Sequence, residues 1–352
     1  MAEINTHYKK HPLYQEDLAR IAEAADLQML QGKSFLITGS TGLLGVFLID
    51  VLMHLNEKGA DITVYALGRS QEKAFQRLGE YRDDRHFQFI THDATESLKN
   101  LPAADFIVPL ASNTHPLAYS QFPVETIHIN VKGAEHALEK ACDCGATVLY
   151  PSTVEIYGNS KDTDKFVETF TGELNLETSR SCYTESKRLS EALCQSYRAE
   201  RGAHVKIARL SRVFGPTMLM SDSKASSQFI KKALDNEDIV LKSKGEQLFS
   251  YTYTADAVGA MLHILTHGAE GTAYNIACDD CNVRLKDFAM LCAEWAGKEV
   301  VFELPSETEQ KGFSIATRAI LDNARLLSIG WKPAYTMKDA VWRTLEILRY
   351  GQ

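Results

Sequence analysis

The most informative residues in the sequence are a tyrosine and a lysine four positions apart. Tyr183 and Lys187 open a predicted helix that continues through RLSEALCQSYRAE. Side chains at positions i and i+4 share one helix face, so the ammonium can lower the pKa of the phenol and also hold a nicotinamide ribose. Upstream, a predicted strand in PSTVEIYG ends in Ser152 and Thr153, which can supply a hydroxyl to the same phenol. The spacing therefore indicates a phenol placed for acid–base chemistry beside a nicotinamide cofactor.

A glycine-rich turn lies between a predicted strand and a predicted helix. In FLITGSTGLLG, glycines stand at positions 39, 42 and 45. Glycines at such a turn let backbone N–H groups and the helix N-terminus approach a pyrophosphate closely. Because a strand precedes the turn and a helix follows it, the pattern predicts a dinucleotide site. We expect this site to use Gly39, Ser40, Thr41, Gly42, Leu43, Leu44 and Gly45.

The end of the next predicted strand, ITVYALGRS, bears on the choice between NAD and NADP. An acidic residue would normally bind the adenosine ribose there, but Gly68, Arg69 and Ser70 occupy the position. Arginine can pair with a 2′-phosphate, as NADP requires, whereas a solvated arginine beside bound NAD is the alternative. Asp93, which ends HFQFITHD, is placed to bind the adenine amino group. Further cofactor contacts are expected from Ala94, Leu110, Ala111, Ser112, Asn130, Pro151 and Ser152.

The elements that position these residues follow a regular order. Short apolar runs alternate with helical stretches over residues 32–215, in SFLITG, LLGVFLIDVLMHLNEKG, DITVYALG, HFQFITHD, ADFIVPLAS and ATVLYPST. Strands alternating with helices imply parallel crossovers, and therefore an α/β fold with a doubly wound parallel sheet that binds NAD(P). From residue 216 to residue 352 the alternation gives way to mixed segments. We expect a smaller C-terminal α/β substrate-binding domain there, intertwined with the first.

Residues 1–31 precede the first predicted strand. In LYQEDLARIAEAADLQML, apolar side chains recur at roughly helical spacing, at Leu18, Ile21, Ala25, Leu27 and Leu30. This pattern predicts an amphipathic helical extension that packs on the core or on a neighbouring subunit.

Composition narrows the classes of partner. The 352 residues carry a formal net charge of -8 and give a pI of about 5.8, which leaves no global basic field for nucleic acid. An uninterrupted apolar run long enough to span a membrane is absent from the sequence, and the first residues are polar, so we expect no membrane partner and a cytoplasmic protein. The 7 cysteines are expected to be thiols, and because Cys142/Cys144 and Cys278/Cys281 lack a matching pair at zinc-site spacing, no metal is expected.

Several motifs together resemble the extended short-chain dehydrogenase/reductase superfamily, in its nucleotide-sugar epimerase, dehydratase and decarboxylase branch. They are TGSTGLLG, PSTVEIYG, YTESK, RLSRVFGP, SYTYTADAV and LDNARLLSIGWKP. The resemblance implies a Rossmann-type fold, retained NAD or NADP and a nucleotide-sugar substrate. It also implies a catalytic triad of Thr153 as hydroxyl partner, Tyr183 as acid/base and Lys187 as electrostatic support. The sugar would pass through a 4-keto stage in a redox-neutral cycle.

The residues after the triad threonine distinguish the branches. The 4,6-dehydratases carry an aspartate and a glutamate there, whereas this chain has Val154 and Glu155, and valine cannot protonate a departing hydroxyl. The pattern is closer to the UDP-glucuronate decarboxylases. We expect Glu155 to act on the sugar during the ketosugar stage, provided that the strand stays extended, so that Thr153 and Glu155 share one face and Val154 points into the packing.

Two departures from the decarboxylase pattern move positive charge within the pocket. Arg212 stands where many members carry a substrate-binding asparagine, and Phe249 stands where a diphosphate-binding arginine is usual. A substrate with altered stereochemistry or a different anionic group is a fair inference from this change. The candidate substrate-binding residues are Asn113, His115, Arg212, Lys224, Gln247 and Arg318.

The sequence thus favours a redox-neutral enzyme acting on a nucleotide-activated sugar, by uronate decarboxylation or by epimerisation. A 4,6-dehydratase is a third reaction, and a non-catalytic NAD(P)-binding regulatory protein is an alternative of another class. The family resemblance also implies a homodimer. Its interface would be a four-helix bundle built from helices around residues 118–141 and 183–201, with a seam that includes Val131, Ala134, Ala137, Leu189, Ala192 and Leu193.

Overall fold

The computed structural model describes residues 6–114, 116–159, 163–303 and 317–351. Its largest element is a seven-stranded parallel sheet with the strand order β10-β6-β5-β4-β1-β2-β3. The strands of this sheet are β1 (Ser34–Thr38), β2 (Thr63–Gly68), β3 (Phe87–Thr91), β4 (Phe106–Pro109), β5 (Thr147–Thr153), β6 (His204–Leu210) and β10 (Ala273–Ile276). The order reverses between β1 and β4, which is where ligands bind in open sheets of this kind. The predicted α/β class and doubly wound sheet are confirmed.

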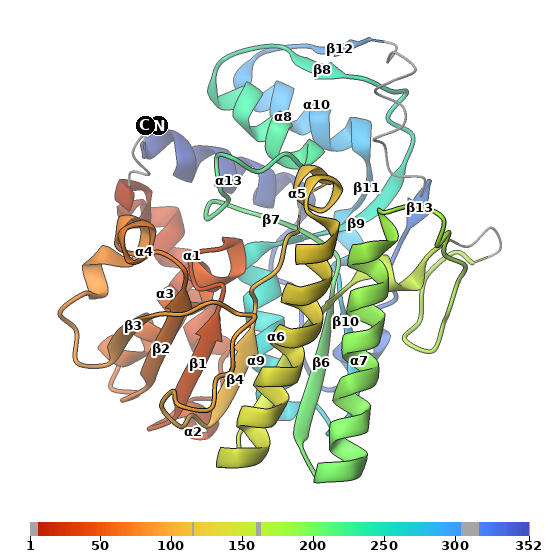
Figure 1. The fold of residues 1–352 in the computed structure, drawn as a ribbon. Helices are drawn as coiled ribbons and strands as arrows, with labels where there is room; N and C mark the ends of the chain where they lie inside the picture. Colours follow the sequence, from red (N-terminus) through yellow and green to blue (C-terminus); the bar gives the residue numbers. More distant parts are fainter. Residues whose placement is uncertain (1–5, 115, 160–162, 304–316, 352) are drawn as a thin grey trace.

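Helices cover both faces of the sheet because successive strand residues point to opposite faces. Phe35 and Ile37 pack in one buried cluster, whereas Leu36 between them packs in the other. Figure 1 shows α6 and α7 side by side on one face, while α3 and α9 lie on the other. The helices that flank the sheet are α3 (Leu43–Glu57), α4 (Gln71–Leu78), η2 (Gly79–Tyr81), α5 (Pro116–Gln121), α6 (Pro123–Cys144), α7 (Ser181–Arg201) and α9 (Thr254–His267).

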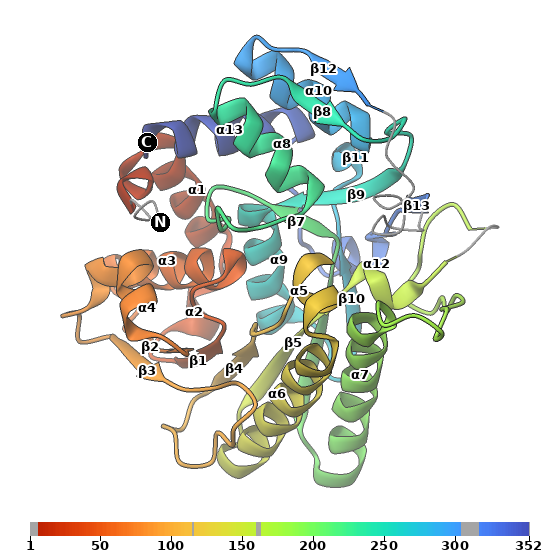
Figure 2. The same ribbon diagram turned by 45° about the horizontal axis from the view of Figure 1, so that its top comes forward.

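A smaller set of strands and helices lies above the carboxyl edge of the large sheet (Figure 2). Its strands are β7 (Arg212–Phe214), β8 (Ile239–Leu241), β9 (Leu248–Tyr253), β11 (Asn282–Arg284), β12 (Val300–Phe302) and β13 (Arg318–Ala319). Its helices are α8 (Ala225–Leu234), η4 (Asp279–Cys281), α10 (Leu285–Ala296) and α13 (Met337–Tyr350). Helix α12 (Ala324–Ser328) packs instead beside the edge strand β10 of the large sheet. Strand β9 pairs with β7, β11 and β13, and β8 pairs with β12.

The chain crosses the predicted domain boundary at residue 216 in both directions. Strand β7 precedes the boundary but pairs with β9 of the small sheet, and β10 follows it but adds to the edge of the large sheet. A division into residues 32–215 and 216–352 stays a prediction, and these crossings show how closely the two parts are interleaved.

The N-terminal segment differs from the single helix that the apolar spacing predicted. It forms η1 (Thr6–Lys10), α1 (Pro12–Ala24) and α2 (Leu27–Leu30), and α1 ends at Ala25, whose backbone is extended. Asp26 then caps α2 by accepting a hydrogen bond from the N–H of Met29, so the helix restarts in a new register. Leu30 is fully buried, whereas Leu27 is 37% exposed, and its predicted place on the packed face was wrong.

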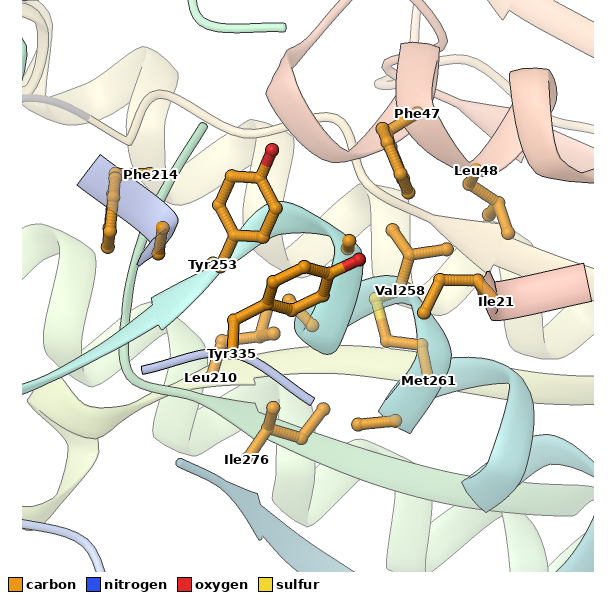
Figure 3. Packing of buried hydrophobic residues seen from close by; sticks show 14 of the residues in the cluster. Ile21, Phe47, Leu48, Leu210, Phe214, Tyr253, Val258, Met261, Ile276 and Tyr335 are labelled. Carbon is orange, nitrogen blue, oxygen red and sulfur yellow. The ribbon is translucent and has the colours of Figure 1, made fainter. Parts of the chain in front are cut away.

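Helix α1 is held in the body of the molecule by apolar packing and by one carboxylate. Ile21 packs beside Val258 and Met261 of α9 (Figure 3). The fully buried Asp17 accepts hydrogen bonds from the hydroxyls of Tyr253 and Tyr335, at 2.6 and 2.7 Å, and from Nε of Arg343 at 2.9 Å. The extension therefore bonds to the last strand residue of β9 and to the C-terminal helix α13.

Candidate active site

A cavity of about 980 Å³ lies between the carboxyl edge of the large sheet and the smaller set of elements. It is lined by the glycine-rich turn, by the ends of β4, β5 and β6, by the start of α7 and by the segments around α8 and β8. Of the predicted site residues, the lining includes Gly39, Gly42, Leu43, Leu44, Gly45, Leu110, Ser112, Asn113, Ser152, Thr153, Glu155, Tyr183, Arg212, Lys224 and Gln247.

The glycine-rich turn packs too closely against its surroundings to accept side chains. Gly39 has a φ of 64°, and a Cβ built on it would lie 2.6 Å from the backbone N of Ala111. A Cβ on Gly45 would lie 2.5 Å from the carbonyl oxygen of Gly39. Gly42 is the N-cap of α3, and no side chain of the described residues caps the helix there. The first-turn N–H groups of α3 are therefore left for an anionic ligand such as a phosphate.

Thr153 and Tyr183 come together at the base of the cavity. Thr153 is the last residue of β5, and Tyr183 lies in the first turn of α7. Burial raises the pKa of Tyr183 well above its usual value, and the Thr153 hydroxyl opposes that effect. Thr153, and not Ser152, is therefore the hydroxyl that acts on the phenol. Ser152 Oγ is buried and has no hydrogen-bond partner among the described residues.

Lys187 follows Tyr183 by one turn of α7 and is buried, at 4% exposure. Its Nζ donates to the carbonyl oxygen of Pro151 at 2.8 Å and lies 5.0 Å from the ring centroid of Tyr150. Burial lowers the pKa of Lys187 to about 8. The charges of Tyr119 and Glu155 raise the pKa of Tyr183 further. Electrostatic support of the phenol by Lys187 stays a prediction.

Glu155 faces the cavity by a different route from the one predicted. The strand does not stay extended past Thr153: β5 ends there, and η3 (Val154–Tyr157) begins, with the Glu155 N–H donating to Thr153 Oγ at 3.3 Å. Both Val154 and Glu155 line the cavity, although Val154 is only 4% exposed. The premise of an extended strand was therefore wrong, whereas the placement of Glu155 beside Thr153 is retained by the helical turn.

Two arginines flank the carboxylate of Glu155. Nη2 of Arg212 lies 3.5 Å from Glu155 Oε1, and Nη2 of Arg180 lies 4.0 Å from Glu155 Oε2. The guanidinium of Arg212 lies 3.6 Å from the ring centroid of Phe249, and that of Arg180 lies 5.8 Å from the ring centroid of Tyr119. Each guanidinium is thus held between a ring and the shared carboxylate.

Residues 35–277 match the model of the NAD dependent epimerase/dehydratase family. The chain belongs to this family. The match extends from β1 to the end of β10 and so includes every strand of the large sheet.

Named relatives in this family are similar to the chain over most of its length. UDP-glucuronic acid decarboxylase 1 of Xenopus tropicalis is 28% identical over 317 residues, which are 90% of this chain and 72% of that protein. UDP-glucuronic acid decarboxylase 3 of Arabidopsis thaliana is 35% identical over 232 residues, which are 65% of each chain.

Solved structures with the same fold include other enzymes of the family. A UDP-glucose 4-epimerase of Thermotoga maritima superposes with a TM-score of 0.77 at 21% identity, over 90% of this chain and 98% of that chain. A dTDP-glucose 4,6-dehydratase of Streptomyces venezuelae gives a TM-score of 0.76 at 23% identity, over 90% and 97% of the two chains. At these identities the superpositions establish the Rossmann-type fold.

NAD is the cofactor that this family uses, and the turn fits it. The uncapped start of α3 and the close-packed Gly39 and Gly45 leave backbone, not side chains, at the position for a pyrophosphate. Two predicted contacts in the turn have structural partners instead. Ser40 Oγ donates to the carbonyl oxygen of Leu67 at 2.9 Å, and the carbonyl oxygen of Thr41 accepts from Arg77 at 2.6 Å.

The predicted adenosine contacts lie at the ends of β2 and β3. The Arg69 side chain is 67% exposed, and Nη1 lies 3.4 Å from Glu125. Asp93 accepts hydrogen bonds from the N–H and the hydroxyl of Thr95, at 2.8 and 2.7 Å, which hold the pKa of its carboxyl below the usual value. Ala94 follows Asp93 in the same loop. Binding of adenosine by Arg69 and Asp93 stays a prediction.

Asn130 links the end of β4 to α7. Its Oδ1 accepts from Ser112 Oγ at 2.7 Å, and its Nδ2 donates to Ser186 Oγ at 2.8 Å, one residue before Lys187. In the neighbouring loop, Asn113 donates to Thr126 Oγ1 at 3.1 Å and lines the cavity. Asn130 therefore aligns the helix that carries Tyr183 and Lys187 with the carboxyl edge of the sheet.

The predicted substrate contacts are not all brought together. Lys224 and Gln247 line the cavity, where Lys224 lies 3.2 Å from Asp222 and Gln247 Oε1 has no partner among the described residues. Arg318 is not among the lining residues, and its Nη2 lies 3.1 Å from the exposed carboxylate of Asp164. His115 lies outside the described residues.

Three residues of the site were missed by the sequence reasoning. Tyr119 of α5 stacks on Tyr183, Arg180 precedes α7 and flanks Glu155, and Arg77 holds the glycine-rich turn. Arg77 is only 2% exposed and also donates to the carbonyl oxygen of Thr217 at 2.5 Å. Arg180 stands three residues before Tyr183, at the start of the same helix. Residues three positions apart in a helix lie on one side, so this spacing was a signal that Arg180 belongs to the site.

The described residues give no support to a metal or a membrane span. Groups of three or more His, Cys, Asp or Glu side chains able to hold a metal ion do not occur in the part of the chain that the structure describes. Within the same residues, every helix is too short or too polar to cross a membrane.

Proposed function

We propose that the protein uses NAD in a redox-neutral conversion of a nucleotide-linked uronate, through a 4-keto stage, with decarboxylation as the outcome. The placement of Thr153, Glu155 and Tyr183 together in the lining of one cavity carries the proposal. The relatives named as UDP-glucuronic acid decarboxylases support UDP-glucuronate as the substrate. Epimerisation at C4 of the same substrate would use the same first step.

Tyr183 is the acid/base of this proposal. Its phenolate accepts the proton of the C4 hydroxyl and so becomes the phenol, which returns that proton when the hydride comes back to C4, and the Thr153 hydroxyl lies beside it. When bound, NAD supplies the hydride acceptor at C4 and returns the hydride at the end of the cycle. Lys187 binds the nicotinamide ribose: its ammonium, which donates to the Pro151 carbonyl in this structure, donates to the ribose hydroxyls instead.

Glu155 is placed to act at the carbon next to C4. Its backbone N–H donates to the side-chain hydroxyl of Thr153, and its side chain lines the cavity together with Tyr183. A ketone at C4 makes loss of a carboxylate from C5 favourable, because the ketone accepts the electron pair left behind. Glu155 then transfers to C5 the proton that takes the place of the lost carboxylate.

Val154 argues against dehydration. It lines the cavity at the position where the dehydratases that the sequence resembles carry an acidic residue, and it cannot donate a proton to a departing hydroxyl. A purely regulatory NAD-binding protein would have no need of Thr153, Tyr183 and Lys187 together.

We also propose a cytoplasmic homodimer. All seven cysteines of the chain are free thiols, as a reducing compartment keeps them. Exposed apolar side chains on α6 and α7 support pairing of subunits through these helices, among them Val124 and Leu189, at 64% and 50% exposure.

The test is the mass of the product after incubation of the NAD-loaded enzyme with UDP-glucuronate. A loss of about 44 mass units, equal to carbon dioxide, is expected from the redox-neutral scheme. An unchanged mass with inverted C4 would replace decarboxylation by epimerisation. A loss of about 18 units would show dehydration, and bound NAD without turnover of any nucleotide sugar would favour the regulatory alternative.

A further inference from the structure

The cations that line the large cavity fall into two groups. One group is Arg180 and Arg212, on either side of Glu155 at the end of β5. The other consists of lysines from the segments around α8 and β8, namely Lys224, Lys232 and Lys242. A nucleotide-linked neutral sugar carries one anionic group, the diphosphate, whereas a nucleotide-linked uronate carries a second one on the sugar ring. The cavity thus has a cationic region for each of two anionic groups.

The arginine group lies beside the reacting atoms. Arg212 contacts Glu155, whose N–H donates to Thr153 Oγ1, and Tyr183 lines the same cavity. A sugar whose C4 hydroxyl reaches Tyr183 therefore places its C5 substituent near Arg212. The diphosphate is attached at C1, across the ring from C4, and so lies toward the lysines.

Arg212 is held with one donor unused. Its guanidinium carbon lies 3.6 Å from the ring centroid of Phe249. Its Nη2 lies 3.5 Å from Oε1 of Glu155. Nη1 is buried and has no hydrogen-bond partner among the described residues. A buried donor without a partner is costly, so this geometry is explained best by a ligand acceptor.

The charges of the cluster are not balanced within it. Glu155 contributes one negative charge, and the two guanidiniums contribute two positive charges. Glu155 alone would repel an anionic sugar, whereas the cluster as a whole attracts one. Because arginine binds a carboxylate with two parallel N–H donors, Arg212 is suited to a carboxylate in particular.

We propose that Arg212, supported by Phe249 and assisted by Arg180, binds the ring carboxylate of the substrate and so selects uronates over neutral sugars. This inference rests on the proposed function. It assigns the arginine at position 212 to the sugar and not to the diphosphate, which the lysine group takes.

The test measures binding, not turnover, with UDP-glucuronate and UDP-glucose as a matched pair of ligands. The NAD-loaded protein carries Tyr183→Phe, so that neither ligand is consumed during calorimetry. Into this background we introduce Arg212→Met, which keeps a long side chain on Phe249 but removes the charge. We expect UDP-glucuronate to bind about tenfold or more weakly and UDP-glucose to change by less than about threefold.

Lys224→Met is the matched control, because it removes one cation from the other region. It is expected to weaken both ligands by the same factor. Arg180→Met is a second variant, in case Arg212→Met does not fold. It replaces the other arginine beside Glu155, which does not belong to β7. It is expected to weaken the binding of UDP-glucuronate but not that of UDP-glucose.

Equal weakening of both ligands by Arg212→Met or by Arg180→Met would overturn the inference, and so would the absence of any effect. The product assay on the unaltered enzyme decides the proposed function separately. If the enzyme converts UDP-glucuronate but the arginine variants do not discriminate, only the carboxylate site fails. If the enzyme converts UDP-glucose and ignores UDP-glucuronate, the proposed function fails as well.

Discussion

The ring of Tyr119 stacks on the ring of Tyr183, with the centroids 5.5 Å apart and the planes inclined by 25°. Tyr119 comes from α5 and Tyr183 from α7, so the stack fixes the phenol against a second element of the fold. A substitution that keeps the Tyr183 ring therefore removes the hydroxyl without disturbing the packing.

Tyr183→Phe is expected to lower turnover by about 10²–10⁴-fold, because the proton-transfer group is lost. Binding of NAD should stay close to that of the unaltered enzyme, since the ring and its stack remain. Steady-state rates and a cofactor titration measure the two effects. Tyr197→Phe, in the same helix but away from the cavity, serves as the control and should retain activity. Full activity of Tyr183→Phe would show that the phenol is not the acid/base.

Glu155→Gln is expected to stop the reaction after the first hydride transfer. The amide keeps the size of the side chain but cannot exchange a proton with the sugar. Reduced cofactor should then accumulate and absorb near about 340 nm, as the dihydronicotinamide ring does. Glu185→Gln, on α7 but not among the residues that line the cavity, is the control. Wild-type turnover without trapped reduced cofactor would leave Glu155 a structural residue.

Arg69→Ala tests the choice between NAD and NADP. If the guanidinium pairs with a 2′-phosphate, the variant should lose about 1.5–3 kcal/mol of binding free energy for NADP and little for NAD. Fluorescence titration of both cofactors gives the difference. Equal effects on the two cofactors would assign Arg69 to its surface contact with Glu125.

The proposed dimer gives a prediction about α7. Ala134 and Ala137, which the sequence placed in the seam, are 2% and 0% exposed within one subunit, so they pack internally. Leu189 is 50% exposed and is free to meet a partner. Light scattering should find a dimer at micromolar concentration and a monomer for Leu189→Glu. Leu327→Glu, at a position 41% exposed on α12, should remain dimeric. A monomeric unaltered protein would rule out the bundle.

Asp256 gives a prediction about pH. It is 2% exposed and accepts hydrogen bonds from the N–H groups of Ala334 and Tyr335, and burial raises its pKa to about 7. An aspartate in the unfolded chain has a pKa of about 3.9. Between these two values the folded state binds more protons than the unfolded state, so this group makes stability fall as the pH rises.

Asp256→Asn removes that titration. The free energy of unfolding of the unaltered protein, minus that of the variant, should therefore decrease between about pH 5 and about pH 7.5. Urea unfolding at the two pH values measures it. A difference that stays constant or increases would show that Asp256 ionises normally in the folded protein.

Local pattern was enough to predict the large sheet and to place Thr153 and Tyr183 in the same cavity. Strand and helix periods are properties of short segments, and the residues at the carboxyl ends of parallel strands meet at one edge. The same reasoning failed at Glu155, because apolar alternation does not show whether a strand continues or turns into a 3-10 helix. It also failed at Ala25, although Asp26 is a typical N-cap residue and was a signal that the helix restarts.

Contacts between distant elements could not be read from local pattern. The spacing of Tyr183 and Lys187 placed both on one helix face, but the carbonyl that takes the Lys187 ammonium belongs to β5. Tyr119 and Arg180 are 61 residues apart in the sequence. They meet only because α5 packs beside the start of α7. Such contacts depend on the packing of helices, which one sequence does not specify.

The carboxylate of Asp17 has a consequence for the order of folding in the cell. Its partner Arg343 lies 326 residues further along the chain. At the usual pace of about 5–20 residues per second, a ribosome needs roughly 16–65 s to add that length. During this time α1 has already been synthesised, but Arg343, the cationic partner of Asp17, has not. The hydrogen bonds around Asp17 can therefore be completed only after Arg343 has been synthesised.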